Sequence, residues 1–158
     1  MNSTQPSNKK LKWLEVPIQL DIWDHSLNVY DGPLLPLIIK PYIRNYKVGR
    51  TLINSGSSLN LLFANAYDNL GLPRNRLLPV KEPFYGIMMG MLAYPLGRID
   101  LQVTLKVGEN TRSKFLTFEA VDFESAYNYI LGQLVLKKFM AVAHFAYLVL
   151  KVPVPMVR

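Results

Sequence analysis

Residues 52–58 form the segment of the chain that bears most directly on chemistry. Two apolar residues, Leu52 and Ile53, run into Asn54-Ser55-Gly56, and two further serines follow. Because glycine permits a tight turn, the pattern predicts a short strand that ends in a turn carrying Asn54. An amide does not titrate near neutral pH and cannot accept a proton from water. Asn54 therefore cannot act as a general base.

The other chemically capable side chains form no comparable pattern. Six carboxylates could in principle act as the general base in place of Asn54, but none has the turn setting of residues 52–58. They are Asp21, Asp24, Asp31, Asp100, Asp122 and Glu124. His25 and His144 are far apart in sequence, and the chain has no cysteine. A metal site needs more ligands than these, and no Gly-x-Ser-x-Gly elbow is present. We predict no metal and no cofactor.

Composition indicates one folded domain with few charges. The chain has 158 residues, of which 50% are hydrophobic and 18% charged, and its net charge is +7. The basic residues are scattered, so we favour a solvated basic surface over a nucleic-acid site. The longest apolar run, residues 139–150, is too short to span a bilayer. With no cysteine and a polar start, we expect an intracellular protein, cytoplasmic or nuclear, with neither nucleic-acid nor membrane partner.

The pattern along the chain predicts a β-rich domain after a flexible lead-in. We expect residues 1–25 to form an N-terminal arm and lead-in, and residues 26–158 to form the domain. Predicted strands cover residues 34–39, 42–48, 51–53, 98–106, 113–121, 129–131 and a hairpin within 142–150. Residues 78–84 and 91–96 flank a further hairpin. Helices are predicted at 61–70, capped by Gly71, and within 133–140. Many short strands with little helix favour a barrel or sandwich.

Four sequence blocks follow one another in the same order as the motifs of a known protein family. They are residues 48–62, Phe84-Tyr85-Gly86, residues 94–103, and residues 126–132 with the trailing His144 and residues 150–153. With them the chain resembles the retropepsin-like aspartic protease domain of plant gypsy-type LTR retrotransposon polyproteins. The resemblance covers about four-fifths of the chain. It implies a mostly β, retropepsin-like (acid protease) closed barrel with one or two short helices, a single-lobe subunit spanning residues 26–158.

The resemblance also implies a role for each matching residue. Asn54 stands at the position of the catalytic Asp, Ser55 at that of the hydroxyl that braces two loops across a dimer, and Gly56 permits the close turn. The substrate-binding flap corresponds to Tyr85, Gly86, Ile87, Met88, Met89 and Gly90, and structural support beneath the loop to Ile130, Leu131 and Gly132. One chain supplies one loop, so a complete site implies a homodimer around an extended peptide.

Three functional hypotheses follow from this resemblance and its departures. The family's two Asp side chains share a proton, and Asn54 removes that pair. The first hypothesis is a degenerate retroelement protease domain, inactive as written, that keeps a dimerising, peptide-groove fold. The second is an active aspartic endopeptidase that processes a retrotransposon polyprotein, if position 54 is natively Asp. The third is a non-catalytic structural module.

Overall fold

The fold is seen in a computed structural model that describes residues 17–21, 24, 35–85 and 92–153. Its strands are β1 (Ile38–Ile39), β2 (Tyr42–Ile43), β3 (Tyr46–Lys47), β4 (Thr51–Ile53), β5 (Leu61–Phe63), β6 (Phe84–Tyr85), β7 (Leu92–Ala93), β8 (Gly97–Val107), β9 (Asn110–Val121), β10 (Tyr129–Leu131), β11 (Val142–His144) and β12 (Val149–Lys151). Its helices are α1 (Ala64–Asn69), the 3-10 turn η3 (Arg74–Arg76) and α2 (Gln133–Phe139). None of the helices in these ranges is both long and apolar enough to cross a lipid bilayer.

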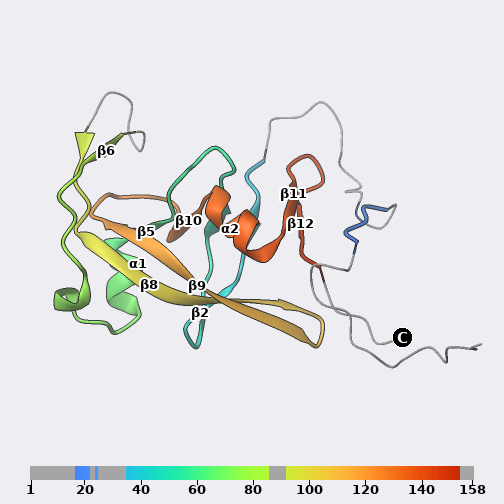
Figure 1. The fold of residues 1–158 in the computed structure, drawn as a ribbon, viewed down its shortest axis with the longest axis horizontal. Helices are drawn as coiled ribbons and strands as arrows, with labels where there is room; N and C mark the ends of the chain where they lie inside the picture. The colour runs from blue at the N-terminus through green and yellow to red at the C-terminus, as the bar shows by residue number, and fades with distance from the viewer. Residues whose placement is uncertain (1–16, 22–23, 25–34, 86–91, 154–158) are drawn as a thin grey trace, which may run out of the picture.

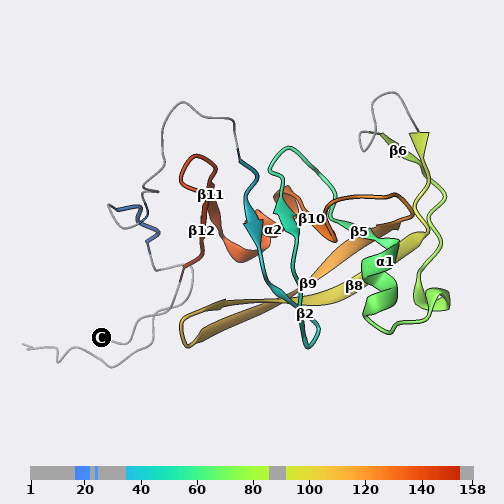
Figure 2. The ribbon, with the colours of Figure 1, turned by 180° about the vertical axis from the view of Figure 1, so that it is seen from behind.

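One curled sheet dominates the molecule. Its strand order is β1-β4-β10-β5-β9-β8-β2-β3, and β6–β7 and β11–β12 form separate two-stranded hairpins. The sheet has the shape of a half-barrel, with β1 and β3 as its outermost strands. Figures 1 and 2 show the long β8–β9 hairpin running lengthwise, with α1 and β6 toward one end and β11–β12 toward the other. The predicted mostly β architecture with a few short helices is confirmed.

The β8–β9 hairpin forms because its sequence alternates. Buried and exposed residues alternate from Gly97 through Val103, and Leu105 is again buried. Alternate residues of a strand point to opposite faces, so one face of β8 packs in the core while the other meets solvent. Gly108, at a φ of +60°, makes the turn before β9. The predicted strands at 98–106 and 113–121 are confirmed.

The predicted helix at residues 61–70 is wrong in its first part. Leu61–Phe63 is strand β5, which pairs parallel with β9 and antiparallel with β10. All of its residues are buried, because both faces of the sheet are covered here. A strand buried on both faces has a continuous apolar run without alternation. Helix α1 begins only at Ala64, and Gly71, at a φ of +73°, follows its C-cap as predicted.

Two predicted strands near the start of the domain are shorter than expected. Residues 42–48 form a hairpin, in which β2 and β3 pair through Tyr42 and Lys47. The chain turns at Arg44, whose φ is +55°. A non-glycine residue in this left-handed region is uncommon, so the sequence carries little sign of the turn. The strand predicted at 34–39 is limited to Ile38–Ile39.

Two apolar clusters cover opposite faces of the sheet around β5. The main core includes Leu62, Phe118, Tyr129 and Leu131, each essentially inaccessible to solvent. Burial raises the pKa of the Tyr129 phenol above its usual value, so this ring stays neutral across the physiological range. The smaller cluster consists of Leu61, Phe63 and Val121, with Leu59, Phe123, Tyr127 and Ile130 packed against it.

The end of the lead-in contacts the last strand. Lys151 Nζ donates to the Gln19 carbonyl oxygen at 2.7 Å and forms an ion pair with Asp24 at 2.6 Å. Both partners lie before residue 26. The boundary that we predicted at this point stays a prediction.

Candidate functional site: the Asn54 loop

The candidate site is the loop of residues 54–60, which joins β4 to β5. Strand β10 lies between these two strands, parallel to β4 and antiparallel to β5. The chain therefore leaves the sheet on one side of β10 and re-enters it on the other, so that the loop passes over the end of β10. In Figures 1 and 2 this loop projects from the same side of the molecule as the β6–β7 hairpin.

Asn54 lies at the start of this loop and is exposed. Its backbone N–H donates to the Leu131 carbonyl at 2.9 Å, and its carbonyl accepts from Ser57 N–H at 3.1 Å. Its side-chain oxygen Oδ1 accepts from Gly56 N–H at 3.0 Å. An Asn that caps its own turn in this way is a common turn device. The amide oxygen is thus held inside its own loop, as an acceptor that cannot take up a proton near neutral pH.

Gly132 is the closest support beneath the loop. A Cβ on Gly132 would lie 2.4 Å from the Ser57 carbonyl oxygen and 2.7 Å from that of Leu59. The next residue, Gln133, donates its N–H to the Ser57 carbonyl at 2.8 Å. Only a residue without a side chain fits at 132, because the neighbouring atoms are backbone and cannot rotate away.

The three residues predicted to support the loop do so unequally. Leu131 accepts the hydrogen bond from Asn54 N–H, and Gly132 packs directly against the carbonyls of Ser57 and Leu59. Ile130 packs instead with the smaller apolar cluster on the other face of the sheet. Gly56 has less room than an open turn position, since a Cβ there would lie 3.3 Å from Asn54 Oδ1. Ser55 is exposed, and its contact across a dimer stays a prediction.

Asn60 is a key residue of the site that sequence reasoning missed. It is almost fully buried, with 3% of its surface exposed. Its side-chain oxygen accepts from Gly132 N–H at 2.9 Å, and its Nδ2 donates to the Thr117 carbonyl at 3.2 Å. The side chain therefore fastens the loop to β10 and β9 together. The available signal was a polar residue inside the apolar run 59–63, because buried polar groups need hydrogen-bond partners.

A second unpredicted group is Glu119, whose side chain is buried beside β5. Leu61 pairs with Glu119 and with Ile130, so these three side chains lie on one face of the sheet. Arg98 reaches Glu119 Oε1 through two nitrogens, Nε and Nη2, each at 2.7 Å. The other carboxylate oxygen, Oε2, is buried and has no hydrogen-bond partner among the described residues. The small-cluster face of the sheet thus carries a buried carboxyl group, and Arg98 contacts one of its two oxygens.

The remaining carboxylates with assigned contacts are engaged elsewhere. Asp100 accepts from Thr117 Oγ1 at 2.6 Å. Asp68 forms an ion pair with Arg74 at 2.9 Å, and this guanidinium lowers the pKa of Asp68. In the part of the chain that the structure describes, no group of three His, Cys, Asp or Glu residues could hold a metal ion.

The predicted flap is described only at its base. Phe84–Tyr85 and Leu92–Ala93 pair antiparallel as β6 and β7, with Tyr85 opposite Leu92. The hairpin predicted between residues 78–84 and 91–96 is therefore present at its base, and its strands are shorter than those flanks. Its tip, with Gly86, Ile87, Met88, Met89 and Gly90, lies outside the described residues.

Comparison with solved structures identifies the class of fold. The chain is similar to the retroviral protease-like domain of Ddi1 from Leishmania major, with a TM-score of 0.54 and 18% identity over 75% of this chain and 87% of that one. A retropepsin-like aspartic protease from Rickettsia conorii is also similar, with a TM-score of 0.47 and 18% identity over 65% of this chain and 70% of that one. No protein-family model matches the chain, and no curated protein matches it significantly.

The fold is therefore retropepsin-like, as the four sequence blocks predicted. The likeness to the Ddi1 domain carries this conclusion, because it covers most of both chains. At 18% identity it concerns the fold alone. The comparison therefore assigns no catalytic role to Asn54.

Proposed function

We propose that this chain is a catalytically silent retropepsin-like domain that forms a homodimer and binds an extended peptide without cleaving it. One observation carries the proposal: the residue that begins the glycine turn is Asn54, which is exposed, and its Oδ1 is already engaged by Gly56 N–H at 3.0 Å. Two such loops would bring together two neutral amides. Neither amide can take a proton from water, so the general-base step of peptide hydrolysis has no acceptor.

The dimer is supported by the surface that continues from the loop. Helix α2 starts one residue after Gly132, and it carries the exposed Leu134. Met140 and Val142, just beyond the helix, are also exposed, at 47% and 42%. Contiguous exposed apolar patches mark protein interfaces, and we propose that these three side chains, on α2 and just beyond it, belong to one. In the dimer that we propose, a two-fold axis beside this surface brings two Asn54 loops together.

We propose further that the domain derives from a retrotransposon protease that has lost its carboxylate. The supporting observations are the order of the four sequence blocks and a loop whose scaffold is complete apart from the acid. Gly56, Asn60 and Gly132 hold the turn through hydrogen bonds and close packing. On this proposal, restoring an acid at position 54 restores peptidase activity, as the second hypothesis requires of a native Asp.

The test compares the chain as written with Asn54→Asp. Both proteins are incubated with a peptide library between pH 4 and 6, and products are identified by mass spectrometry. We expect no cleavage by the chain as written and cleavage by Asn54→Asp, with rates that differ by about 10⁴-fold or more. Asn45→Asp is the matched control, because Asn45 is also an exposed turn residue and its change adds the same charge.

Two outcomes would overturn the catalytic part of the proposal. One is cleavage by the chain as written when intact mass excludes deamidation. The other is a lack of activity in Asn54→Asp protein that is folded and dimeric. Sedimentation velocity tests the dimer separately, with Leu134→Lys as the interface variant. A chain that stays monomeric and binds no library peptide is the structural module of the third hypothesis.

A further inference from the structure

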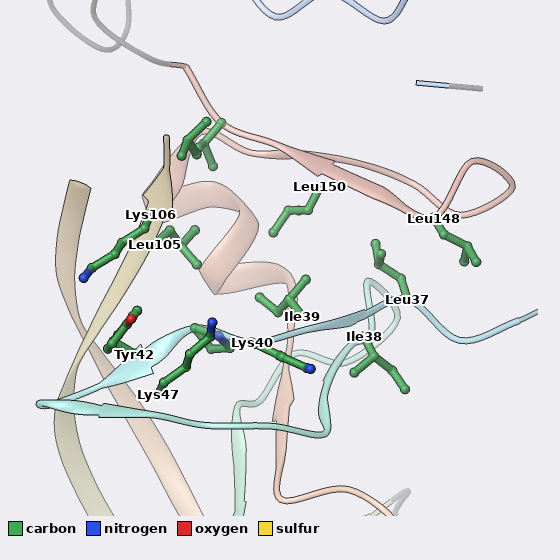
Figure 3. A pocket seen from close by; sticks show the side chains of 13 residues that line it. Leu37, Ile38, Ile39, Lys40, Tyr42, Lys47, Leu105, Lys106, Leu148 and Leu150 are labelled. Atoms are coloured by element: carbon green, nitrogen blue, oxygen red, sulfur yellow. The ribbon is translucent and has the colours of Figure 1, made fainter. Parts of the chain in front are cut away.

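A pocket of about 320 Å³ is formed by residues of β1, β2, the end of β8 and β12. It is bounded by residues 37–42, by Lys47, by residues 105–107 at the end of β8, and by Leu148, Leu150 and Val152 in and around β12. Figure 3 shows this pocket from close by. Its volume lies at the lower end of the range of about 300–1,000 Å³ that is usual for small-molecule sites. No residue of the 54–60 loop lines it, so the pocket is independent of the function proposed above.

One end of the pocket is apolar. Leu37 and Leu105 are nearly buried, with 2% and 9% of their surfaces exposed. Ile39 and Leu150 are half-buried and pack against the main core. In Figure 3 the side chains of Ile39, Leu105 and Leu150 surround the same space, with Leu148 and Leu37 beyond them. This end can take up an apolar group and remove it from water.

The other end is cationic, and strand pairing explains why. Tyr42 lies opposite Lys47 on β3 and opposite Thr104 on β8. Lys106 is the next residue of β8 on the same face as Thr104, because alternate residues share a face. Lys106 Nζ lies 4.1 Å from the centroid of the Tyr42 ring. Tyr42 is therefore flanked by two lysines, and Lys40 lines the pocket beside them.

The charge of the pocket is not balanced by its own lining. Three lysines line it, and none of the lining residues is Asp or Glu. The whole chain carries a net charge of +7, which adds to the positive field at this end. In Figure 3 Lys106 and Lys47 lie on the side of Tyr42, Leu148 and Leu37 lie on the opposite side, and Lys40 lies between them below Ile39. A ligand that matches both ends has an anionic head and an apolar tail.

We propose that this pocket binds a free alkyl carboxylate of medium chain length, with its carboxylate among Lys40, Lys47 and Lys106 and its tail among the leucines. A bilayer lipid presents only its headgroup, so it would leave the apolar end of the pocket unfilled. A monomeric amphiphile fills both ends. Specificity for the anion comes from the lysines, and affinity comes from the buried tail.

The first experiment titrates the full chain with decanoate below its micelle concentration, followed by two-dimensional NMR. We expect saturable binding that shifts the backbone amides of Tyr42, Leu105 and Leu150. Each methylene lost from the tail should weaken binding about fourfold, so octanoate should bind about 15-fold more weakly. Decanol should bind more weakly than decanoate, and decyltrimethylammonium should not bind.

The second experiment separates the lysines from general charge. Lys47→Gln and Lys106→Gln should each weaken decanoate binding about two- to fivefold, the range for one solvent-exposed charge, and should leave decanol binding unchanged. Lys81→Gln is the matched control, because Lys81 is exposed and does not line the pocket. Equal binding of decanol and decanoate overturns the proposal, as does an equal effect of Lys81→Gln. Shifts caused by anionic phospholipid vesicles but not by decanoate also overturn it.

Discussion

Replacing Gly132 by alanine tests whether the end of β10 holds the Asn54 loop in shape. The added methyl would sit 2.4 Å from the Ser57 carbonyl oxygen and 2.7 Å from that of Leu59. The backbone angles at Gly132 (φ −96°, ψ −163°) suit alanine, so backbone strain adds nothing to the cost. Forcing extra atoms into a packed site costs about 1–3 kcal/mol. Displacement of the hydrogen bond from Gly132 N–H to Asn60 adds about 1 kcal/mol.

We therefore expect Gly132→Ala to lower the free energy of unfolding by about 2–4 kcal/mol, the sum of the packing and hydrogen-bond costs. The assay is equilibrium urea denaturation, with linear extrapolation to water. Gly49→Ala is the control, because nothing lies within 4 Å of its added Cβ. Its stability should change by less than about 1 kcal/mol. If the two variants are equally stable, the close packing inferred between Gly132 and the loop is wrong.

Three further predictions concern polar contacts elsewhere in the chain. Asn60→Leu removes both side-chain hydrogen bonds of a buried residue, and we expect a loss of about 1–3 kcal/mol in thermal denaturation. Arg98→Gln leaves the buried Glu119 carboxylate without its cation, so it should destabilise more at pH 7 than the double variant with Glu119→Gln does. The Lys151 hydrogen bond lowers the pKa of Asp24. The ionised Asp24 therefore stabilises the folded state at pH values above its unfolded-state pKa of about 4, and this stabilisation is lost as pH falls through the folded-state pKa. Asp24→Asn should remove this acid dependence, which hydrogen exchange of the backbone amides in the lead-in would measure.

The long β8–β9 hairpin could be predicted because one face of β8 is exposed to solvent while the other is buried. Ile99, Leu101 and Val103 alternate with polar residues, and the structure buries the apolar set while exposing its neighbours. This pattern arises only when the two faces of a strand meet different environments. Strand β8 meets this condition over most of its length, so its position follows from its own residues.

The short central strands could not be predicted in the same way. Leu61–Phe63 lies between two apolar clusters and has no polar face, so its apolar residues fit a helix as well as a strand. The turn between β2 and β3 uses Arg44 at a positive φ without glycine. In both places the contacts of distant segments decide the conformation, and local propensity does not report them.

The glycine turn was enough to locate the candidate site in the sequence. The contacts that hold the turn in place could not be predicted from it. Asn54 and Gly56 follow from the local motif. Asn60 and Glu119 acquire their positions only when β9 and β10 pair with β5. A residue whose partners are 57 and 72 positions further along the chain, as those of Asn60 are, leaves no periodic trace in the sequence.

The placement of β10 between β4 and β5 also sets an order of events during synthesis. When the ribosome has made β4, the loop and β5, these strands have no strand between them, and Leu131 and Gly132 do not yet exist. The turn at Asn54 therefore acquires its lasting conformation only after the chain has grown past residue 132. A nascent or truncated chain that stops short of that point leaves two strand edges unpaired, which makes it a target for quality control and a hazard for self-association.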